Sequence, residues 1–145
     1  MGSAFMVLGS VGVAFGQAAP AQQAAQKPGL AFEGDLGLLL VYVKPDKTAD
    51  FEAIMAKTKE ALLKLDTPES KQQAESLKVY KLPPKADAPF VLYVVKAEPP
   101  VKGGEYSPLM LIYKGFPTEY SGYLTKWKEL LHTIAPNPLD LTLLK

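Results

Sequence analysis

The feature that most constrains this chain is a seven-residue stretch, FVLYVVK, at residues 90–96. A β-strand with one face in water alternates apolar and polar side chains. This stretch does not alternate, because every residue before its closing lysine is apolar or aromatic. Residues 36–43, LGLLLVYV, have the same property. Any fold of this chain must therefore cover two strands on both of their faces.

The segments around these two strands predict a helix and two further strands. Residues 49–65 carry apolar side chains at helical spacing, and Thr48 is a suitable N-cap with acidic residues in the turn that follows. Residues 76–82 and 139–145 alternate between apolar and polar side chains, so we expect strands with one wetter face. The polar stretch between the first helix and residue 76 is a loop or a short helical turn.

A second helix is expected in two pieces. Residues 107–116 begin with serine and proline, which are favoured at the start of a helix. Pro117 interrupts the pattern, and helical spacing returns from Thr118 to Ile134. The resulting order is βαββαβ, an α+β arrangement of the ferredoxin-like kind with a four-stranded antiparallel sheet and helices on one face. Its first and third strands are central, which agrees with the two strands that are apolar on both faces.

Two helices cover only one face of such a sheet. Leaving the apolar side chains of the second face in water forgoes roughly 1.5–3 kcal/mol for each of them. A patch of this size usually marks an interface. We therefore expect a homodimer in which two copies pack sheet against sheet with two-fold symmetry. The alternative that residues 107–116 or the N-terminal leader fold over that face within one copy remains open.

The stretch VYVKPDKTADFEAIMAKTKEALLK, residues 41–64, resembles the opening of dimeric α/β-barrel domains of the antibiotic-biosynthesis-monooxygenase-like superfamily. In that group a first strand ends in a Lys-Pro-Gly-Lys-like turn, which Lys44-Pro45-Asp46-Lys47 matches, and a helix begins through an acidic residue and Phe-Glu. The resemblance spans about residues 38–96 and implies a dimeric α/β barrel. Residues 103–135 depart from the pattern.

The resemblance implies that activity, where a member has one, uses a polar pocket between sheet and helices. Haem-degrading members use an Asn, a Trp and a His in set places. This chain has Trp127 and His132 on one expected helix and Asn137 in the loop after it. Those positions do not reproduce the set, so no catalytic role is carried over.

Six residues are candidates for lining a ligand pocket: Tyr42, Tyr93, Tyr113, Tyr120, Trp127 and His132. An apolar cavity with phenol hydroxyls suits a small apolar or aromatic ligand. The alternative for the tyrosines and for Trp127 is burial in the core. His132 would lie about 140° around the helix from Trp127 and so face solvent. No catalytic residue can be assigned from the sequence.

Composition weighs against several classes of function. The net charge is +1 and all 16 basic residues are lysine, which disfavours nucleic acid as a partner. Cysteine is absent and there is a single histidine, so thiolate catalysis, zinc–thiolate sites and iron–sulfur clusters are not expected. We therefore expect no metal and no cofactor.

The N-terminus predicts export. Within residues 1–16, MGSAFMVLGSVGVAFG, the apolar run from Ala4 to Phe15 has the length of a signal-peptide core. Small residues suited to cleavage after Gly16 follow it, although no basic residue precedes the apolar run. The alternative is a buried N-terminal helix or strand. Residues 17–32 are a leader of Ala, Gln and Pro, and residues 33–145 are the folded domain. The mature chain, without a membrane span, would be periplasmic or secreted.

The sequence therefore predicts an exported, non-enzymatic module for small-ligand binding or self-assembly. The alternative is an enzyme of the dimeric α/β-barrel superfamily, either a cofactor-independent monooxygenase or isomerase or a haem-binding enzyme.

Overall fold

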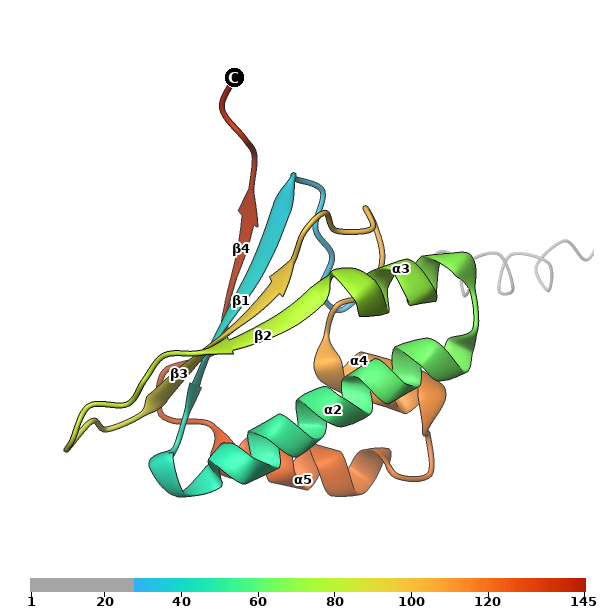
Figure 1. Cartoon of the computed structure of the whole chain (residues 1–145). Helices are drawn as coiled ribbons and strands as arrows, with labels where there is room; N and C mark the ends of the chain where they lie inside the picture. Colours follow the sequence, from blue (N-terminus) through green and yellow to red (C-terminus); the bar gives the residue numbers. More distant parts are fainter. Residues whose placement is uncertain (1–27) are drawn as a thin grey trace, which may run out of the picture.

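The computed structural model describes residues 28–145, so the expected signal peptide and most of the expected leader lie outside the described residues. The chain forms one antiparallel sheet with its helices gathered on one side (Figure 1). In chain order the elements are β1 (Leu36–Val43), the short 3-10 turn η1 (Pro45–Lys47), α2 (Thr48–Leu65), α3 (Pro68–Ser76), β2 (Leu77–Lys81), β3 (Val91–Ala97), α4 (Pro108–Gly115), α5 (Tyr120–Leu130) and β4 (Asn137–Leu141).

The four strands lie in the order β2-β3-β1-β4, and each neighbouring pair is antiparallel. β1 and β3 are therefore central, and β2 and β4 are edges, as the apolar patterns predict. Leu40 marks the middle of the sheet, opposite Val94 of β3 and Asn137 of β4. The α+β class and the four-stranded antiparallel sheet are confirmed, and the strand order is consistent with the ferredoxin-like arrangement.

The helices cover one face of the sheet and form the core with it. Val41 and Tyr93 point from the two central strands into this core and are almost fully buried. α2 supplies Phe51, Ile54 and Leu62 from a single stripe, which is the helical spacing visible in the sequence. Burial of each such side chain stabilises the fold by roughly 1.5–3 kcal/mol.

α4 belongs to the helix layer and packs against α2. A Cβ added at Gly115 would lie 2.8 Å from the Cβ of Ala61, so the close approach of the two helices requires glycine there. Leu111 and Ile112 of α4 are fully buried in the core. The segment of residues 107–116 therefore does not cover the second face of the sheet, and that alternative is wrong.

α3 is a nine-residue helix where the sequence leaves a loop or a short turn open. Its start is closed by a reciprocal cap: the Ser70 N–H donates to the Thr67 Oγ1, and the Thr67 N–H donates to the Ser70 Oγ, both at 3.0 Å. Its inward residues are small or polar, Ser70, Gln73 and Ala74. Hydrophobic periodicity is therefore nearly absent, which is why the pattern does not predict a full helix.

α5 ends at Leu130, earlier than the expected boundary near Ile134. Leu131 pairs with Val43 at the end of β1, and the His132 N–H donates to the carbonyl of Tyr42 at 2.9 Å. These backbone bonds replace the last helical turn. The prediction that His132 lies on a helix is therefore wrong, because α5 ends before it, and its side chain is half-buried.

The last residues of the expected leader contact the domain. The N–H groups of Gly29 and Leu30 donate to the two carboxylate oxygens of Glu105 at 2.7 and 2.8 Å. Phe32 is 3% exposed and its ring lies against Gly37, where any Cβ would collide with it. The packed structure thus includes residues that the composition assigns to the leader.

Candidate functional site

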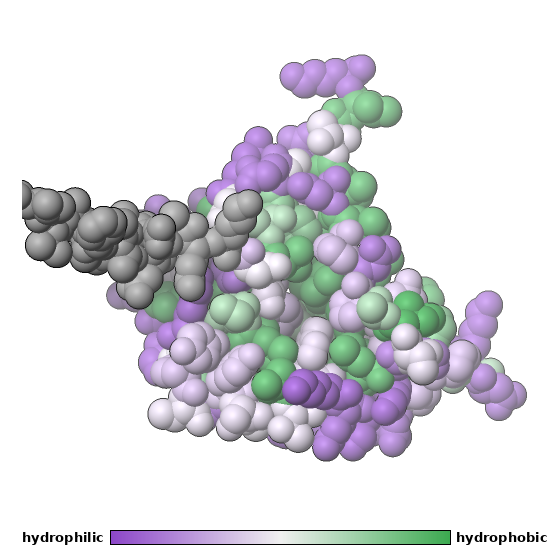
Figure 2. Space-filling view, turned by 180° about the vertical axis from the view of Figure 1, so that it is seen from behind, coloured by the Kyte–Doolittle hydropathy of each residue, from purple (hydrophilic) through white to green (hydrophobic). Residues whose placement is uncertain are grey.

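The most distinctive surface of the molecule is the face of the sheet that no described helix covers, which we call the open face. Its side chains alternate with the core residues along each strand. The apolar and aromatic residues that line it are Leu36, Leu38, Leu40, Tyr42, Tyr80, Leu82, Phe90, Leu92, Val94, Leu139 and Leu141. All of them remain at least partly exposed. Figure 2 shows the molecule from behind, with hydrophobic residues below the projecting C-terminal end.

Charged side chains on the open face gather at the end where β1 begins. Within the four strands they are Lys78 and Lys96, which stand opposite each other on β2 and β3. The carboxylate of Glu98 forms an ion pair with Lys96, and this bond raises the pKa of the lysine. The open face thus has an apolar middle and a charged border at one end.

Aromatic side chains gather at the other end of the open face, where β1 finishes. The rings of Tyr42 and Phe90 meet edge to face with centroids 5.0 Å apart, and the His132 ring lies 5.4 Å from that of Phe90. Phe90, which is not one of the six candidates, therefore links two candidate residues, Tyr42 and His132. Phe90 shares the strand parity of Leu92, which is the signal that places it on this face.

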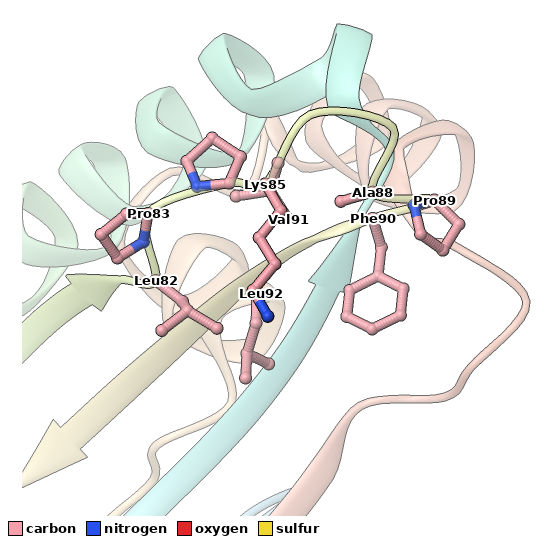
Figure 3. A pocket seen from close by; sticks show the side chains of 9 residues that line it. Leu82, Pro83, Lys85, Ala88, Pro89, Phe90, Val91 and Leu92 are labelled. Atoms are coloured by element: carbon pink, nitrogen blue, oxygen red, sulfur yellow. The ribbon is translucent and has the colours of Figure 1, made fainter.

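A hollow of about 240 Å³ lies beside this aromatic cluster, at the loop that joins β2 to β3 (Figure 3). We call it the hairpin hollow. Its wall is apolar and is formed by Leu82, Pro83, Pro84, Pro89, Phe90 and Leu92 among others. Lys85 is the single charged residue in the lining, and its long side chain runs across the hollow towards Leu92 (Figure 3). Such a wall accepts apolar groups and offers one cation.

A second hollow, of about 230 Å³, lies where β1 begins and β4 ends. Its lining combines the carboxylates of Asp35 and Glu98 with leucine side chains, among them Leu143. Residues 142–145, which we call the tail, continue past β4 and project beyond the sheet (Figure 1). Leu143 and Leu144 of the tail are 73% and 91% exposed.

Tyr93 and Trp127 lie on the helix side of the sheet. The Phe51 ring stands between them, 4.3 Å from the Tyr93 ring and 6.3 Å from the indole of Trp127. Tyr93 is 1% exposed, and Trp127 packs against the core from outside it. Both side chains serve the packing of α2 and α5 on the sheet.

The hydroxyl of Tyr93 reaches the edge of this core and donates a 2.7 Å hydrogen bond to the Oε1 of Glu52. This bond is the main cause of a lowered pKa at Glu52, to which Lys81, 3.4 Å from the same oxygen, adds. Burial first, and then the bond to Glu52, raise the pKa of Tyr93. The tyrosine therefore stays protonated and acts as a donor, which the sequence pattern does not reveal.

Tyr113 and Tyr120 form a third group on the outer surface of the helices. Their rings meet edge to face with centroids 5.2 Å apart, at α4 and the start of α5. The six candidate residues thus lie in three separate places: the end of the open face, the core, and the helix surface. Neither of the two hollows described above is lined by a tyrosine or a histidine.

The described residues offer no grouping of three or more His, Cys, Asp or Glu side chains that is suited to a metal ion. None of the helices within residues 28–145 is both long enough and apolar enough to cross a membrane.

No family model matches this chain, and neither the curated proteins nor the solved structures include a match to it. The resemblance to dimeric α/β barrels therefore stays a prediction.

Proposed function

We propose that this protein is a self-assembly module whose open face is the contact surface between two identical copies. The observation that carries the proposal is the apolar open face itself, which spans all four strands around Leu40 and has charged residues at one end. Protein interfaces have this organisation, with an apolar middle and a polar rim. Two ferredoxin-like sheets joined in this way make the dimeric α/β barrel that the sequence favours.

The size of the open face suits a dimer. Four strands of five to eight residues, about 4.8 Å apart, give a footprint of roughly 400 Å². The accessible area of a sheet studded with side chains exceeds its footprint, and the hairpin and the tail extend the face, so two copies would bury about 1,000 Å² or more in total. That value reaches the range of specific protein–protein interfaces.

The two edges of the sheet are less suited to pairing than its face. β2 carries Lys78 and Lys81 at its edge, and β4 carries Pro138, which has no N–H to donate. Lysine and proline on edge strands oppose the addition of further strands. The contact is therefore proposed between faces and not between edges.

A matched pair of variants tests the proposal. Leu40→Lys places a charge in the middle of the open face, whereas Leu63→Lys places one on the outer surface of α2, where the leucine is 57% exposed. A buried charge without a partner costs at least about 2 kcal/mol, so Leu40→Lys should raise the dimer dissociation constant about 30-fold or more. Leu63→Lys should leave it unchanged in sedimentation experiments. Equal dissociation constants for both variants would contradict the proposal.

A second candidate function is the binding of a small apolar or aromatic ligand at the end of the open face. It is favoured by the aromatic cluster of Tyr42, Phe90 and His132 beside the hairpin hollow. Native mass spectrometry of protein purified from its own compartment checks it, since a bound molecule adds a fixed mass that Phe90→Ala should remove. The enzyme alternative has less support, because its candidate residues lie in three separate groups.

We also propose that the chain is exported and loses residues 1–16. The support is the apolar N-terminal run and the small residues before Gln17. Intact-mass measurement on cell fractions checks this. The expected species lacks 16 residues and lies outside the cytoplasm, and an uncleaved chain in the cytoplasmic fraction would contradict it.

A further inference from the structure

We infer that the two copies interlock at their ends, with the tail of each copy seated in the hairpin hollow of the other. This inference rests on the proposed sheet-to-sheet dimer and specifies which parts of the two faces meet. It starts from two features that remain unexplained in a single copy: a projecting pair of leucines and an apolar hollow.

The tail presents its leucines in a defined position. The Leu143 N–H donates to the Oδ2 of Asp35 at 2.8 Å, so the backbone of the tail is held beside the start of β1. Leu141 points to the open face by strand alternation, Leu143 lines the second hollow beside it, and Leu144 follows in the chain. Leucines that are 73% and 91% exposed beside an apolar face indicate a contact with another surface.

The hairpin hollow is suited to receive a leucine. Three prolines stiffen its wall, and Leu82, Phe90 and Leu92 supply an apolar lining. A cavity of about 150 Å³ is known to hold a benzene-sized group, and this hollow has about 240 Å³. Lys85 can lay its aliphatic stem along the guest while its ammonium group stays in water. Because Leu82, Phe90 and Leu92 also line the open face, a partner on that face covers the hollow too.

The hollow and the tail lie at diagonally opposite corners of the sheet. The hairpin joins β2 to β3 at the end where β1 finishes, since Val43 pairs with Val91. The tail follows β4 at the end where β1 begins, since Leu36 pairs with Leu141. Figure 1 shows the hairpin and the C-terminus pointing away from the sheet at its two ends.

Their diagonal placement selects one symmetry for the dimer. A two-fold axis that lies between the sheets and runs along the strands would place each tail over the β2 edge of the partner, but at the end away from the hairpin hollow. An axis across the strands would place each tail at the same end as the hollow, but over β4, on the opposite edge. Only an axis along the other diagonal exchanges both corners, so that both tails meet both hollows. The strands of the two sheets then cross near 90°, which is an established class of sheet packing.

The sheet has the proportions that this symmetry requires. Its width of about 19 Å and its strand lengths of about 17 to 27 Å are similar enough for two copies turned by a right angle to overlap over most of their open faces. The reciprocal exchange then closes both ends of the interface with apolar contacts.

The absence of cysteine from the sequence allows a direct test by cross-linking. Leu144→Cys chains are mixed with Leu82→Cys chains and oxidised mildly. Each chain then carries a single cysteine, so any disulfide joins two chains, and it forms only where their Cα atoms come within about 7 Å of each other. A covalent dimer of the two variants is the expected result, in at least tenfold excess over the control.

The control pairs Leu144→Cys with Leu63→Cys, an equally accessible position on the helix layer. Native mass spectrometry of the same samples reports whether non-covalent dimers exist. Dimers without a specific link between positions 144 and 82 would overturn this inference and leave the sheet-to-sheet proposal standing. A monomer at every concentration would overturn both.

Replacement of the exposed leucines gives an independent readout. The double variant Leu143→Ser and Leu144→Ser should raise the dimer dissociation constant at least about tenfold, because two leucines per copy lose their apolar contact. The matched variant Leu63→Ser and Leu65→Ser removes two exposed leucines from α2 and should leave the constant unchanged. No difference between the two double variants would contradict the interlocked ends.

Discussion

Tyr93 shows how one residue can serve the core and the surface together. Its ring packs 4.3 Å from that of Phe51, while its hydroxyl holds the carboxylate of Glu52 at the surface. The bond ties α2 to β3 at the point where both reach solvent. A phenol in this place is a structural donor whose raised pKa keeps its proton in place.

Tyr93→Phe should lower the free energy of unfolding by about 1 kcal/mol at neutral pH, a small value because Glu52 is half-exposed. The bond lowers the folded-state pKa of Glu52 below its ordinary 4.5. The stabilisation that this bond gives is therefore fully present above pH 4.5, and it is lost as the pH falls through the lowered pKa of Glu52. Urea unfolding at several pH values should show that the difference in unfolding free energy between Tyr93→Phe and the unmodified protein becomes smaller in acid. Tyr120→Phe is the control, and a Tyr93→Phe difference that stays constant down to pH 3 would contradict this account.

The positions of single side chains were only partly predictable. Alternation along β1 and β3 indicates which residues share a face, and Tyr42 and Tyr93 indeed point to opposite sides of the sheet. The position of His132 beside Phe90 depends on where α5 stops, and that depends on a bridge between residues far apart in the chain. Local patterns contain no information about such a bridge.

At the scale of elements, the first described segment depends on one buried carboxylate. Glu105 is 6% exposed and uses both of its oxygens to bind the backbone of residues 29 and 30. The side chain of Gln73 holds the carbonyl of the same residue at 2.7 Å. The segment before β1 is thereby fixed to α3 and to the loop that precedes α4.

Glu105→Gln should release this segment, because an amide has one acceptor oxygen and places an NH₂ group against the second backbone donor. We expect a loss of about 1–3 kcal/mol in the free energy of unfolding and faster proteolytic cleavage before Phe32. The control Glu69→Gln, on the exposed side of α3, should change neither the free energy of unfolding nor the rate of cleavage. An unaltered cleavage rate in Glu105→Gln would show that the segment is held by Phe32 alone.

The sequence predicted elements well where apolar periodicity is strong and poorly where it is weak. β1, β3 and α2 fall within a residue or so of their expected bounds. Capping and small residues define α3, so the pattern does not decide between loop and helix there, and β4 spans Asn137–Leu141 instead of the expected residues 139–145. Each of these differences reflects hydrogen bonding that hydrophobic patterns do not report.

At the scale of the whole molecule, the open face is the feature that the sequence indicated most directly. Two strands that are apolar on both sides require two covers, and the structure places all its described helices on one side. The hairpin hollow and the tail were not predictable in the same way. The hollow and the tail lie at particular corners of the sheet because of the order in which the strands pair, and local sequence patterns do not report that order.

The proposed dimer should respond little to salt. Its contact is mainly apolar, and the charged border at Lys78 and Lys96 lies at one end. Raising sodium chloride from 0.05 to 0.5 M should change the dimer dissociation constant by no more than about threefold, because screening weakens only the exposed charge pairs. Fluorescence-detected sedimentation measures this, and a loss of affinity beyond about tenfold would indicate a contact made by charges.

The decisive measurement is sedimentation equilibrium of the unmodified protein at micromolar concentration. The expected particle has twice the mass of its own denatured chain. A mass equal to that of one chain over the whole range of concentration would show that the open face stays in water, and it would contradict the account.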